Sequence, residues 1–324
     1  MKIIIPVAGI GTRLRPHTFT TPKPLLFVAG KTVLDHVLDQ VLKLNPEEII
    51  FVVGFLGDQI RKFIEQNYSF KAKFVRQDEL LGLGFAVNLA LKEADDGPMM
   101  IVLGDTIVEC DFEKFVAEGD YTLGLMPVDD PHRFGIAEVK DGKVLGLEEK
   151  PEHPKSNLAI IGLYYFKDTA LLRETLQQHV DSGKTTRGEI QLTDALQMMI
   201  DDGVAFSSYE VRKWLDCGKK ETLLETNRHL LKDKNETVAI AGSVIIPPVS
   251  IHPEAVITQS VVGPYVSIGA GTVVDKAVIC NSIIGSESQL KEIVLEDSLV
   301  GNNAKIRGDV KMLNVGHTSE IDRP

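Results

Sequence analysis

The sequence predicts an α/β protein in which a doubly wound, mostly parallel sheet is followed by a small parallel β-helix. Two observations carry this prediction. Strand and helix patterns alternate through the first two-thirds of the 324-residue chain, which is typical of parallel sheets with right-handed crossovers. From about residue 246 the helical periodicity disappears, and short β-branched runs recur at a regular spacing, which is typical of a coiled repeat.

The elements of the first part follow from their apolar patterns. The run from Ile3 to Ala8 predicts a buried strand. Thr32 is placed to cap a helix whose apolar residues recur at helical spacing up to Leu42. Further strands are predicted over residues 49–53, 74–75 and 99–103, and helices over 59–64 and 85–94. Ligands of such sheets bind outside the carboxyl ends of the strands, so the residues after each strand are the first site candidates.

The C-terminal part carries aliphatic residues five or six positions apart. This spacing predicts one inward residue on each side of a triangular coil, and another β-rich fold is the alternative. The aliphatic positions are 251, 257, 262, 268, 274, 279, 284 and 290. A charged stretch between Leu231 and Ala241 predicts a linker, so the predicted domains are residues 1–234 and 235–324.

Composition narrows the function classes. The net charge of −11 argues against a nucleic-acid-binding surface. The cysteines, Cys110, Cys217 and Cys280, are far apart and odd in number, which predicts no disulfide framework and favours a reducing cytoplasm. No apolar run reaches the length of a membrane span, so no membrane partner is expected.

The segment from Gly9 to Pro24 is the most informative motif. It reads Gly-Ile-Gly-Thr-Arg-Leu-Arg-Pro-His-Thr-Phe-Thr-Thr-Pro-Lys-Pro and follows the first predicted strand. Glycines at such a turn let backbone N–H groups converge on an anion, and Arg13, Arg15 and Lys23 add positive charge. The loop suits a triphosphate. It lacks the Gly-Lys-Ser/Thr of a Walker loop and the third glycine of the dinucleotide fingerprint.

Six motifs in family order give the chain a resemblance over nearly its whole length. It resembles the sugar-1-phosphate nucleotidyltransferases, and most of all the glucose-1-phosphate thymidylyltransferase and uridylyltransferase branch. The motifs are Gly9-x-Gly-Thr-Arg-Leu-x-Pro with Pro22-Lys-Pro24, Gln77 with Gly82-Leu-Gly, Leu103-Gly-Asp105, Glu148-Glu-Lys-Pro151, Arg187-Gly-Glu-Ile-Gln-Leu-Thr-Asp194, and Trp214-Leu-Asp216-x-Gly218. The resemblance implies a nucleotide-binding sheet and, as in many members, a left-handed β-helix.

The implied reaction joins a nucleoside triphosphate to a sugar 1-phosphate and releases pyrophosphate. A sugar phosphate is mostly ionised near neutral pH, since its second pKa is about 6, so it can attack the α-phosphorus without a general base. Positioning and charge neutralisation must then supply the catalysis. The resemblance gives this catalytic work to Arg13, on the β- and γ-phosphates, and to Lys23, near the α-phosphate. Arg15 is as well explained by a solvated arginine.

The resemblance also implies a nucleotide site and a Mg²⁺ cofactor. Asp105 and Asp216 would be the metal ligands, since Mg²⁺ takes one or two carboxylates together with phosphate oxygens. Thr106 and Cys217 depart from the residues that are frequent after each aspartate. The implied nucleotide-binding residues are Ala8, Gly9, Gly11, Thr12, Arg13, Gln77, Gly82 and Asp105.

Gln77 and Gly82 are the candidates for base recognition. A side-chain amide matches the donor and acceptor edge of thymine or uracil, and a glycine lets the backbone approach the ring. An ordinary turn before a helix is the alternative. The stretch Gly82-Leu-Gly-Phe-Ala resembles the pyrimidine branch, although Phe85 replaces the Gln or His that is common there.

For the sugar phosphate, Glu149 can accept hydrogen bonds from two sugar hydroxyls, and Lys150 can hold the phosphate. Trp214 is as well explained by core packing as by stacking over the sugar. The full sugar-phosphate set that the resemblance implies is Gly135, Glu149, Lys150, Gly162, Tyr164, Arg187 and Trp214.

Two alternatives remain open. A non-catalytic nucleotide-sugar-binding regulatory subunit is disfavoured because Arg13, Lys23, Asp105 and Asp216 are all present. A bifunctional enzyme with acyltransferase activity in the β-helix would need a histidine, and His252 and His317 are the histidines of that region. A scaffold or homo-oligomerisation role for the β-helix is favoured. Neither the choice between dTTP and UTP nor the identity of the hexose follows from the sequence.

Overall fold

The computed structural model describes residues 1–234, 239–308 and 312–321 and divides the chain into two compact units. Unit 1 comprises residues 1–10 and 37–214, and unit 2 comprises residues 11–36 and 215–324. Most of the glycine-rich segment therefore belongs with the C-terminal residues. The domain boundary between residues 234 and 235 stays a prediction, and residues 235–238 of the predicted linker lie outside the described residues.

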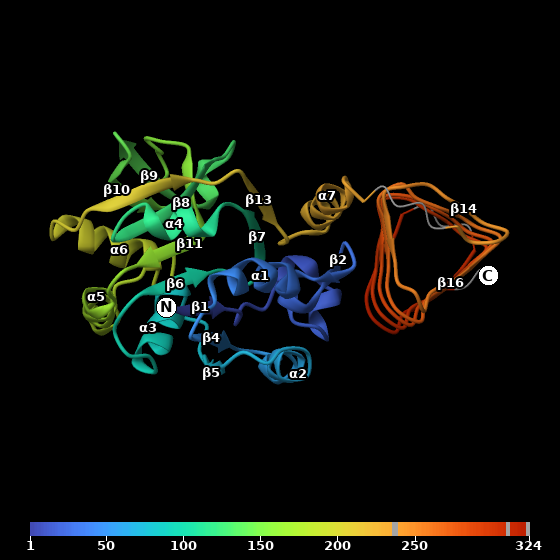
Figure 1. Ribbon diagram of the computed structural model, residues 1–324, viewed down its shortest axis with the longest axis horizontal. Coiled ribbons are helices and arrows are strands. Elements are labelled where there is room, and N and C mark those ends of the chain that lie inside the picture. The colour runs from blue at the N-terminus through green and yellow to red at the C-terminus, as the bar shows by residue number, and fades with distance from the viewer. Residues whose placement is uncertain (235–238, 309–311, 322–324) are drawn as a thin grey trace. The chain divides into compact units, whose positions relative to one another are not determined.

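Unit 1 is built on a nine-stranded mixed sheet (Figure 1). The first four strands are parallel, as the alternating pattern predicts, whereas β11 runs antiparallel to both of its neighbours β6 and β8. The strands in spatial order are β5 (Ala72–Arg76), β4 (Glu48–Val53), β1 (Lys2–Pro6), β6 (Met99–Val102), β11 (Leu158–Phe166), β8 (Tyr121–Pro127), β12 (Phe206–Glu210), β10 (Lys143–Glu149) and β9 (Gly135–Lys140). The predicted α/β class is confirmed.

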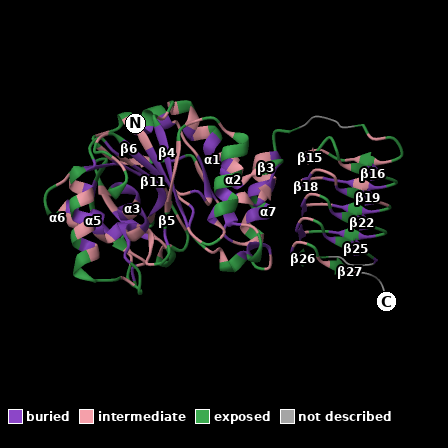
Figure 2. Ribbon diagram, turned by 90° about the horizontal axis from the view of Figure 1, so that it is seen from below, coloured by how far each residue is buried: buried purple, intermediate pink, exposed green. Residues whose placement is uncertain are grey.

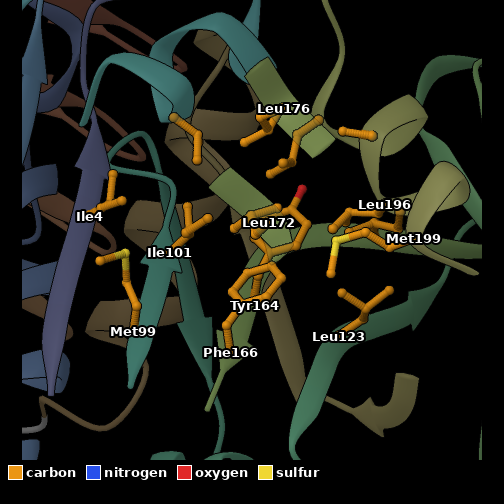
Figure 3. Close-up of a cluster of buried hydrophobic side chains, with 14 of the residues drawn as sticks. Ile4, Met99, Ile101, Leu123, Tyr164, Phe166, Leu172, Leu176, Leu196 and Met199 are labelled. Atoms are coloured by element: carbon orange, nitrogen blue, oxygen red, sulfur yellow. The ribbon is translucent and has the colours of Figure 1, made fainter. Parts of the chain in front are cut away.

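The core of this sheet explains why its strands read as continuous apolar runs. Ile3, Ile4 and Ile5 are all fully buried, which shows that β1 is covered on both faces. Figure 3 shows part of this core, where Ile4 and Ile101 of the sheet face the same cluster as Leu172 and Leu176 of α5. The helices and other short strands of the chain are α1 (Val33–Val41), α2 (Gly57–Asn67), α3 (Leu83–Lys92), α4 (Phe112–Ala117), α5 (Ala170–Ser182), α6 (Leu192–Asp201), α7 (Lys220–Leu231), β7 (Thr106–Glu109) and β13 (Lys213–Asp216).

The predicted cap of the first helix is confirmed. Thr32 Oγ1 accepts a hydrogen bond from the Asp35 N–H at 3.0 Å, and Asp35 Oδ2 accepts one from the Thr32 N–H at 2.9 Å. This reciprocal pair satisfies backbone donors at the start of the helix. Thr32 also ends a short hairpin formed by β2 (Phe27–Val28) and β3 (Lys31–Thr32).

Asn227 on α7 joins the two parts of unit 2 that are far apart in sequence. Its Oδ1 accepts hydrogen bonds from the Ala29 N–H at 3.0 Å and from Ser267 Oγ at 2.6 Å, and its Nδ2 donates to the Tyr265 carbonyl at 3.0 Å. The side chain is fully buried. Because a buried amide is costly to leave unpaired, these bonds fix residues 11–36, α7 and the β-helix as one body.

The C-terminal part of unit 2 is a parallel β-helix of triangular cross-section (Figure 1). Its three sides are β14-β17-β20-β23, β15-β18-β21-β24-β26 and β16-β19-β22-β25-β27. In β16, β19, β22 and β25 the middle residue is buried and the first residue is exposed, and Figure 2 shows exposed residues along this side of the β-helix. The strands are β14 (Val244–Ile245), β15 (Val249–Ile251), β16 (Val256–Thr258), β17 (Val261–Val262), β18 (Val266–Ile268), β19 (Val273–Asp275), β20 (Val278–Ile279), β21 (Ile283–Ile284), β22 (Gln289–Lys291), β23 (Val294–Leu295), β24 (Leu299–Val300), β25 (Lys305–Arg307), β26 (Asn314–Val315) and β27 (Glu320–Ile321).

The predicted inward positions of the β-helix are confirmed with one difference. Val262, Ile268 and Val274 are fully buried, whereas Ile251 in the first coil is only half-buried. Strand pairing stacks equivalent residues, for example Ile251 on Ile268 and Ile268 on Ile284. The first coil lacks a preceding coil in the described β-helix, which explains the greater exposure of Ile251.

Candidate functional site

The segment from Gly11 to Leu25, here called the phosphate loop, contains three short 3₁₀ helices. They are η1 (Thr12–Leu14), η2 (His17–Phe19) and η3 (Lys23–Leu25). Gly11 precedes η1 with φ +69°, and a Cβ there would lie 3.1 Å from Thr18 Cγ2 and 3.2 Å from Lys23 Cβ. A side chain at this position would be both strained and crowded. Gly11 therefore lets η1, η2 and η3 pack together.

The two predicted catalytic side chains of the loop differ in exposure. Arg13 and its neighbour Thr12 are exposed on η1, while Leu14 anchors that helix in the core. Lys23 is only 6% exposed and lies between two buried prolines. A lysine so buried is held in place, and it presents a charge that water screens poorly. Arg15 is exposed and places its guanidinium 4.8 Å from the centroid of the Phe19 ring, which fits the solvated alternative.

Arg13 and Asp216 meet at Gly218. A Cβ on Gly218 would lie 2.8 Å from Arg13 Nη2 and 2.7 Å from Asp216 Oδ1. All three residues belong to unit 2. Gly218 therefore leaves the space in which the predicted phosphate ligand and one predicted metal ligand converge. The motif that ends in Gly218 contains this signal, but sequence reasoning took only Trp214 and Asp216 from it.

Ala8, Gly9 and Asp105 lie at one edge of the sheet in unit 1. The Gly104 N–H donates to the Pro6 carbonyl at 3.3 Å, which joins the ends of β1 and β6. Gly9 has open space where a side chain would be, with no atom within 4 Å. Ala8, Gly9 and Asp105 thus follow the carboxyl ends of neighbouring strands, where ligands of such sheets bind. Asp105 and Asp216 lie in different units, so their pairing as metal ligands stays a prediction.

Gln77 and Gly82 flank the turn between β5 and α3. Gln77 is 5% exposed, and its N–H donates to the Val53 carbonyl at 2.8 Å. Gly82 has φ +108°, and a Cβ there would lie 2.6 Å from the Ile190 carbonyl oxygen. The Gly84 N–H donates to that same carbonyl at 2.9 Å. The predicted base-binding turn is thus bonded to the segment that follows Arg187.

Glu149 and Lys150 form the best-defined polar cluster of unit 1. Lys150 Nζ lies 3.2 Å from Glu149 Oε1, and Glu149 Oε2 accepts a hydrogen bond from Thr193 Oγ1 at 2.7 Å. A Cβ on Gly135 would lie 2.9 Å from Glu149 Oε2 and 2.8 Å from Thr193 Oγ1. The cluster therefore depends on a glycine at position 135. Thr193 was missed by sequence reasoning although it lies within the Arg187 to Asp194 motif.

The Arg187 side chain is bonded to the backbone of the same cluster. Its Nη2 donates to the Lys150 carbonyl at 3.0 Å, and its own φ of +54° places it in a left-handed conformation. Lys150 also has a positive φ, +47°, and its N–H donates to the Phe134 carbonyl at 2.9 Å. Strained residues cluster at sites that surrounding structure holds in place. The structure thus brings Gly135, Glu149, Lys150 and Arg187 together.

Gly162, Tyr164 and Trp214 are more deeply packed. A Cβ on Gly162 would lie 2.4 Å from Leu103 Cδ1, which explains the glycine there. Tyr164 is 3% exposed, and its side chain lies in the hydrophobic cluster of Figure 3. Burial raises the pKa of the Tyr164 phenol, and the Glu149 carboxylate adds to this rise. As sugar contacts these three residues remain predictions.

Trp214 packs against Phe134, with ring centroids 5.1 Å apart at a near-perpendicular angle. Its indole N–H is buried and has no partner among the described residues. The contact with Phe134 fits the packing alternative, and stacking over the sugar stays a prediction.

A cavity of about 320 Å³ lies elsewhere in unit 1 and is lined by residues including Leu147, Glu148 and Lys155. Neither Glu149 nor Gly135 is among the residues that line it. Among the described residues no group of three His, Cys, Asp or Glu side chains is arranged to hold a metal. No helix in the described ranges is long and apolar enough to cross a bilayer.

Comparison with known proteins gives the family of the chain. A family model described as nucleotidyl transferase matches residues 2–233. The low-salt glycan biosynthesis nucleotidyltransferase Agl11 of Haloferax volcanii is 34% identical over 99% of both chains. A glucose-1-phosphate thymidylyltransferase of Streptomyces griseus is 35% identical over 95% of this chain and 88% of its own. The bifunctional protein GlmU of Methanococcus vannielii is 32% identical over 99% of this chain and 76% of its own.

A solved structure supports the same grouping. It is assigned as a glucose-1-phosphate thymidylyltransferase of Bacillus anthracis in complex with sucrose, and it superimposes with a TM-score of 0.63 and 28% identity. The match covers 74% of this chain and 98% of that one. The chain therefore belongs to the nucleotidyl transferase family, and within it to the sugar-1-phosphate nucleotidyltransferases.

Proposed function

We propose that this chain transfers a nucleotidyl group from dTTP or UTP to a hexose 1-phosphate, with glucose 1-phosphate as the first candidate. The products are a nucleotide sugar and pyrophosphate. The observation that carries the proposal is a polar cluster beside Gly135. It is formed by Glu149, Lys150, Arg187 and Thr193. It offers a carboxylate for sugar hydroxyls and two cations for a phosphate.

The chemistry needs no general base. An oxygen of the sugar phosphate dianion forms a bond to the α-phosphorus of the triphosphate, and the bond from that phosphorus to the pyrophosphate oxygen breaks. Arg13 and Lys23 neutralise charge on the triphosphate and on the departing pyrophosphate. Arg13, exposed on η1, would take the β- and γ-phosphates. Lys23, buried and fixed between prolines, would take the α-phosphate.

The donor set fits a magnesium ion. Asp105 and Asp216 offer hard carboxylate oxygens, and the space kept open by Gly218 lies directly against both Asp216 oxygens. Bound Mg²⁺ would neutralise phosphate charge during the transfer. The chain itself holds Asp216 beside Arg13. The proposed metal ligand and the proposed phosphate ligand are thereby kept next to each other.

Choice of a pyrimidine base rests on Gln77. Its amide can donate to and accept from the edge of thymine or uracil, and the side chain is buried. The name of the Streptomyces griseus relative supports dTTP, and the names of the Agl11 and GlmU relatives leave the substrate open. A homo-oligomer held by the β-helix is part of the same proposal.

The bifunctional alternative is less well supported by the β-helix. Both ring nitrogens of His317 are engaged, one by the Asn302 N–H at 2.9 Å and the other by Thr21 Oγ1 at 3.0 Å. Such a histidine is not placed to serve as the base of an acyltransferase. The other candidate, His252, is partly exposed, and its Nδ1 accepts from the Glu254 N–H at 3.2 Å.

The test is pyrophosphate release measured over a matrix of triphosphates and sugar 1-phosphates with Mg²⁺. We expect release to be fastest with dTTP or UTP and glucose 1-phosphate. Lys150→Met should raise the KM for the sugar phosphate about tenfold or more, as expected for the loss of a charged phosphate contact. Lys155→Met is the matched control, because Lys155 is 73% exposed and pairs with Glu138 outside the cluster. No release with any pair from folded protein would refute the proposal.

A further inference from the structure

The phosphate loop is bonded to the last described coil of the β-helix, within unit 2. His17 Nε2 lies 2.8 Å from Asn314 Oδ1, and Thr21 Oγ1 lies 3.0 Å from His317 Nε2. These partners are separated by 297 and 296 residues in the sequence. The predicted role of the β-helix as an assembly element does not account for these contacts.

Close packing accompanies the two hydrogen bonds. The rings of His17 and His317 meet edge to face, with centroids 6.1 Å apart and an interplanar angle of 84°. A Cβ on Gly316 would lie 3.1 Å from both Cβ and Cγ of Pro16. His17 is 2% exposed. The loop side of the contact is therefore buried at His17, while His317 is half-buried and Asn314 is exposed.

The hydrogen bonds assign the protons of both histidines. The Asn302 N–H donates to His317 Nδ1 at 2.9 Å, so the neutral ring carries its proton on Nε2 and donates to Thr21 Oγ1. With Asn314 Oδ1 as acceptor, His17 also donates through Nε2. The coil thus accepts a hydrogen bond from the loop at Asn314 and donates one to the loop at His317.

The coil end is a firm support for the loop. β26 pairs with β24, which places Asn314 beside Leu299 and Val315 beside Val300. The Gly301 N–H donates to the Val315 carbonyl at 2.7 Å. Strand pairing on this side of the triangle continues through the whole stack (Figure 2). A side chain fixed to this stack has little freedom to follow a moving loop.

Within the loop, the clamped residues connect directly to the catalytic candidates. Thr18, adjacent to His17 on η2, donates from Oγ1 to the Gly11 carbonyl at 2.8 Å, and the Leu14 N–H donates to the same carbonyl at 2.9 Å. Gly11 precedes η1, which carries Arg13. Thr21 lies two residues before Lys23 at the start of η3. Holding η2 and Thr21 therefore holds both ends of the phosphate loop.

We propose that the last coil of the β-helix positions the phosphate loop, with Asn314 and His317 acting on Arg13 and Lys23 through His17 and Thr21. Asn314 and His317 are positioning residues that touch no substrate. The proposal rests on the proposed function, since it takes Arg13 and Lys23 as the phosphate-binding side chains. It also makes the β-helix part of the catalytic apparatus in addition to any role in assembly.

The test uses the full chain with Asn314→Leu, His317→Ala and the double variant. We expect kcat/KM for the triphosphate to fall about tenfold in the double variant, as expected when catalytic groups lose a fixed position. Asn314→Asp keeps the acceptor for His17, and His317→Gln keeps a donor for Thr21, so each should recover to within about twofold of the wild type. Glu320→Ala, exposed in the same coil, is the matched control and should change nothing.

Hydrogen exchange separates this proposal from the proposed function, because it needs no turnover. Peptides covering residues 11–25 should exchange faster in the double variant, while the β-helix peptides and the mass by light scattering stay unchanged. If the wild type releases no pyrophosphate, the proposed function fails and hydrogen exchange still decides whether the coil holds the loop. Unchanged exchange overturns the proposal. Faster exchange with unchanged kcat/KM in an active enzyme also overturns it.

Discussion

Gly218→Ala tests whether Arg13 and Asp216 act together. The new methyl group would lie 2.7 Å from Asp216 Oδ1 and 2.8 Å from Arg13 Nη2, where ordinary contact begins at 3.4 Å. Both obstructing atoms are ends of flexible side chains, and φ at Gly218 is not in the left-handed region. The Asp216 and Arg13 side chains should therefore move by about 0.7 Å and about 0.6 Å to reach the 3.4 Å of ordinary contact, with little loss of stability.

The rate should be more sensitive than the stability. Misplacement by 1 Å can cost about 10²-fold in rate, so a shift of this size predicts a fall of about tenfold in kcat/KM. The assay is pyrophosphate release at saturating sugar phosphate, with thermal melting of the same sample. We expect the free energy of unfolding to change by less than about 1 kcal/mol, because the side chains that must move are exposed (Arg13) or only half-buried (Asp216).

Gly146→Ala is the matched control for this variant. A Cβ there meets only Gln197 Oε1 at 3.6 Å, which is ordinary contact. Its kcat/KM should equal that of the wild type. If Gly218→Ala also retains the wild-type value within twofold, the convergence of Arg13 and Asp216 has no part in the reaction, and the reasoning is refuted.

Three further substitutions or conditions test other parts of the site. Asp105→Asn or Asp216→Asn should each lower kcat about 10²-fold with the fold retained, because a charge is lost from the proposed Mg²⁺ site; pyrophosphate release over a range of Mg²⁺ concentrations measures this. Gln77→Ala should weaken discrimination between pyrimidine and purine triphosphates by roughly 1–3 kcal/mol, the cost of an unpaired base edge, as competition kinetics would show. Burial lowers the pKa of the buried His17 and of His317 below 6.5, so the unfolded chain binds protons first as the pH falls. The free energy of unfolding should therefore decrease below about pH 6.5, and thermal melting from pH 8 to 5.5 should show a smaller decrease for His317→Gln.

Each of these outcomes has a contrary result. Near-normal turnover of either aspartate variant would remove that residue from the metal site. An unchanged nucleotide preference in Gln77→Ala would move base recognition to another residue. Equal pH dependence of melting in the wild type and His317→Gln would show that this histidine does not limit stability in acid.

The sequence pattern predicted many of the strands and helices, because the residues that determine them are close together in the sequence. Fully buried strands such as Ile3 to Ile5 leave a continuous apolar run, and Thr32 with Asp35 forms a cap from neighbouring residues. The inward positions of the β-helix repeat along the chain, so their spacing is visible in one dimension. Such features need no knowledge of distant partners.

Long-range pairing was beyond sequence reasoning. Nothing in the composition of residues 11–36 indicates that they join the C-terminal unit, since this depends on Asn227 meeting Ala29 and Ser267. Thr193 contacts Glu149 across 44 residues, and His17 contacts Asn314 across 297. Motifs predicted which residues matter, while the partners that hold them came only from the folded chain.

The most direct test of the account follows phosphorus by ³¹P NMR. Full-length protein is mixed with Mg²⁺, glucose 1-phosphate and either dTTP or UTP. The account predicts that the diphosphate signals of a nucleotide sugar and the signal of pyrophosphate rise in equal amounts while both substrates fall. Hydrolysis of the triphosphate without nucleotide-sugar formation, or no change with either pyrimidine nucleotide from folded protein, would contradict it.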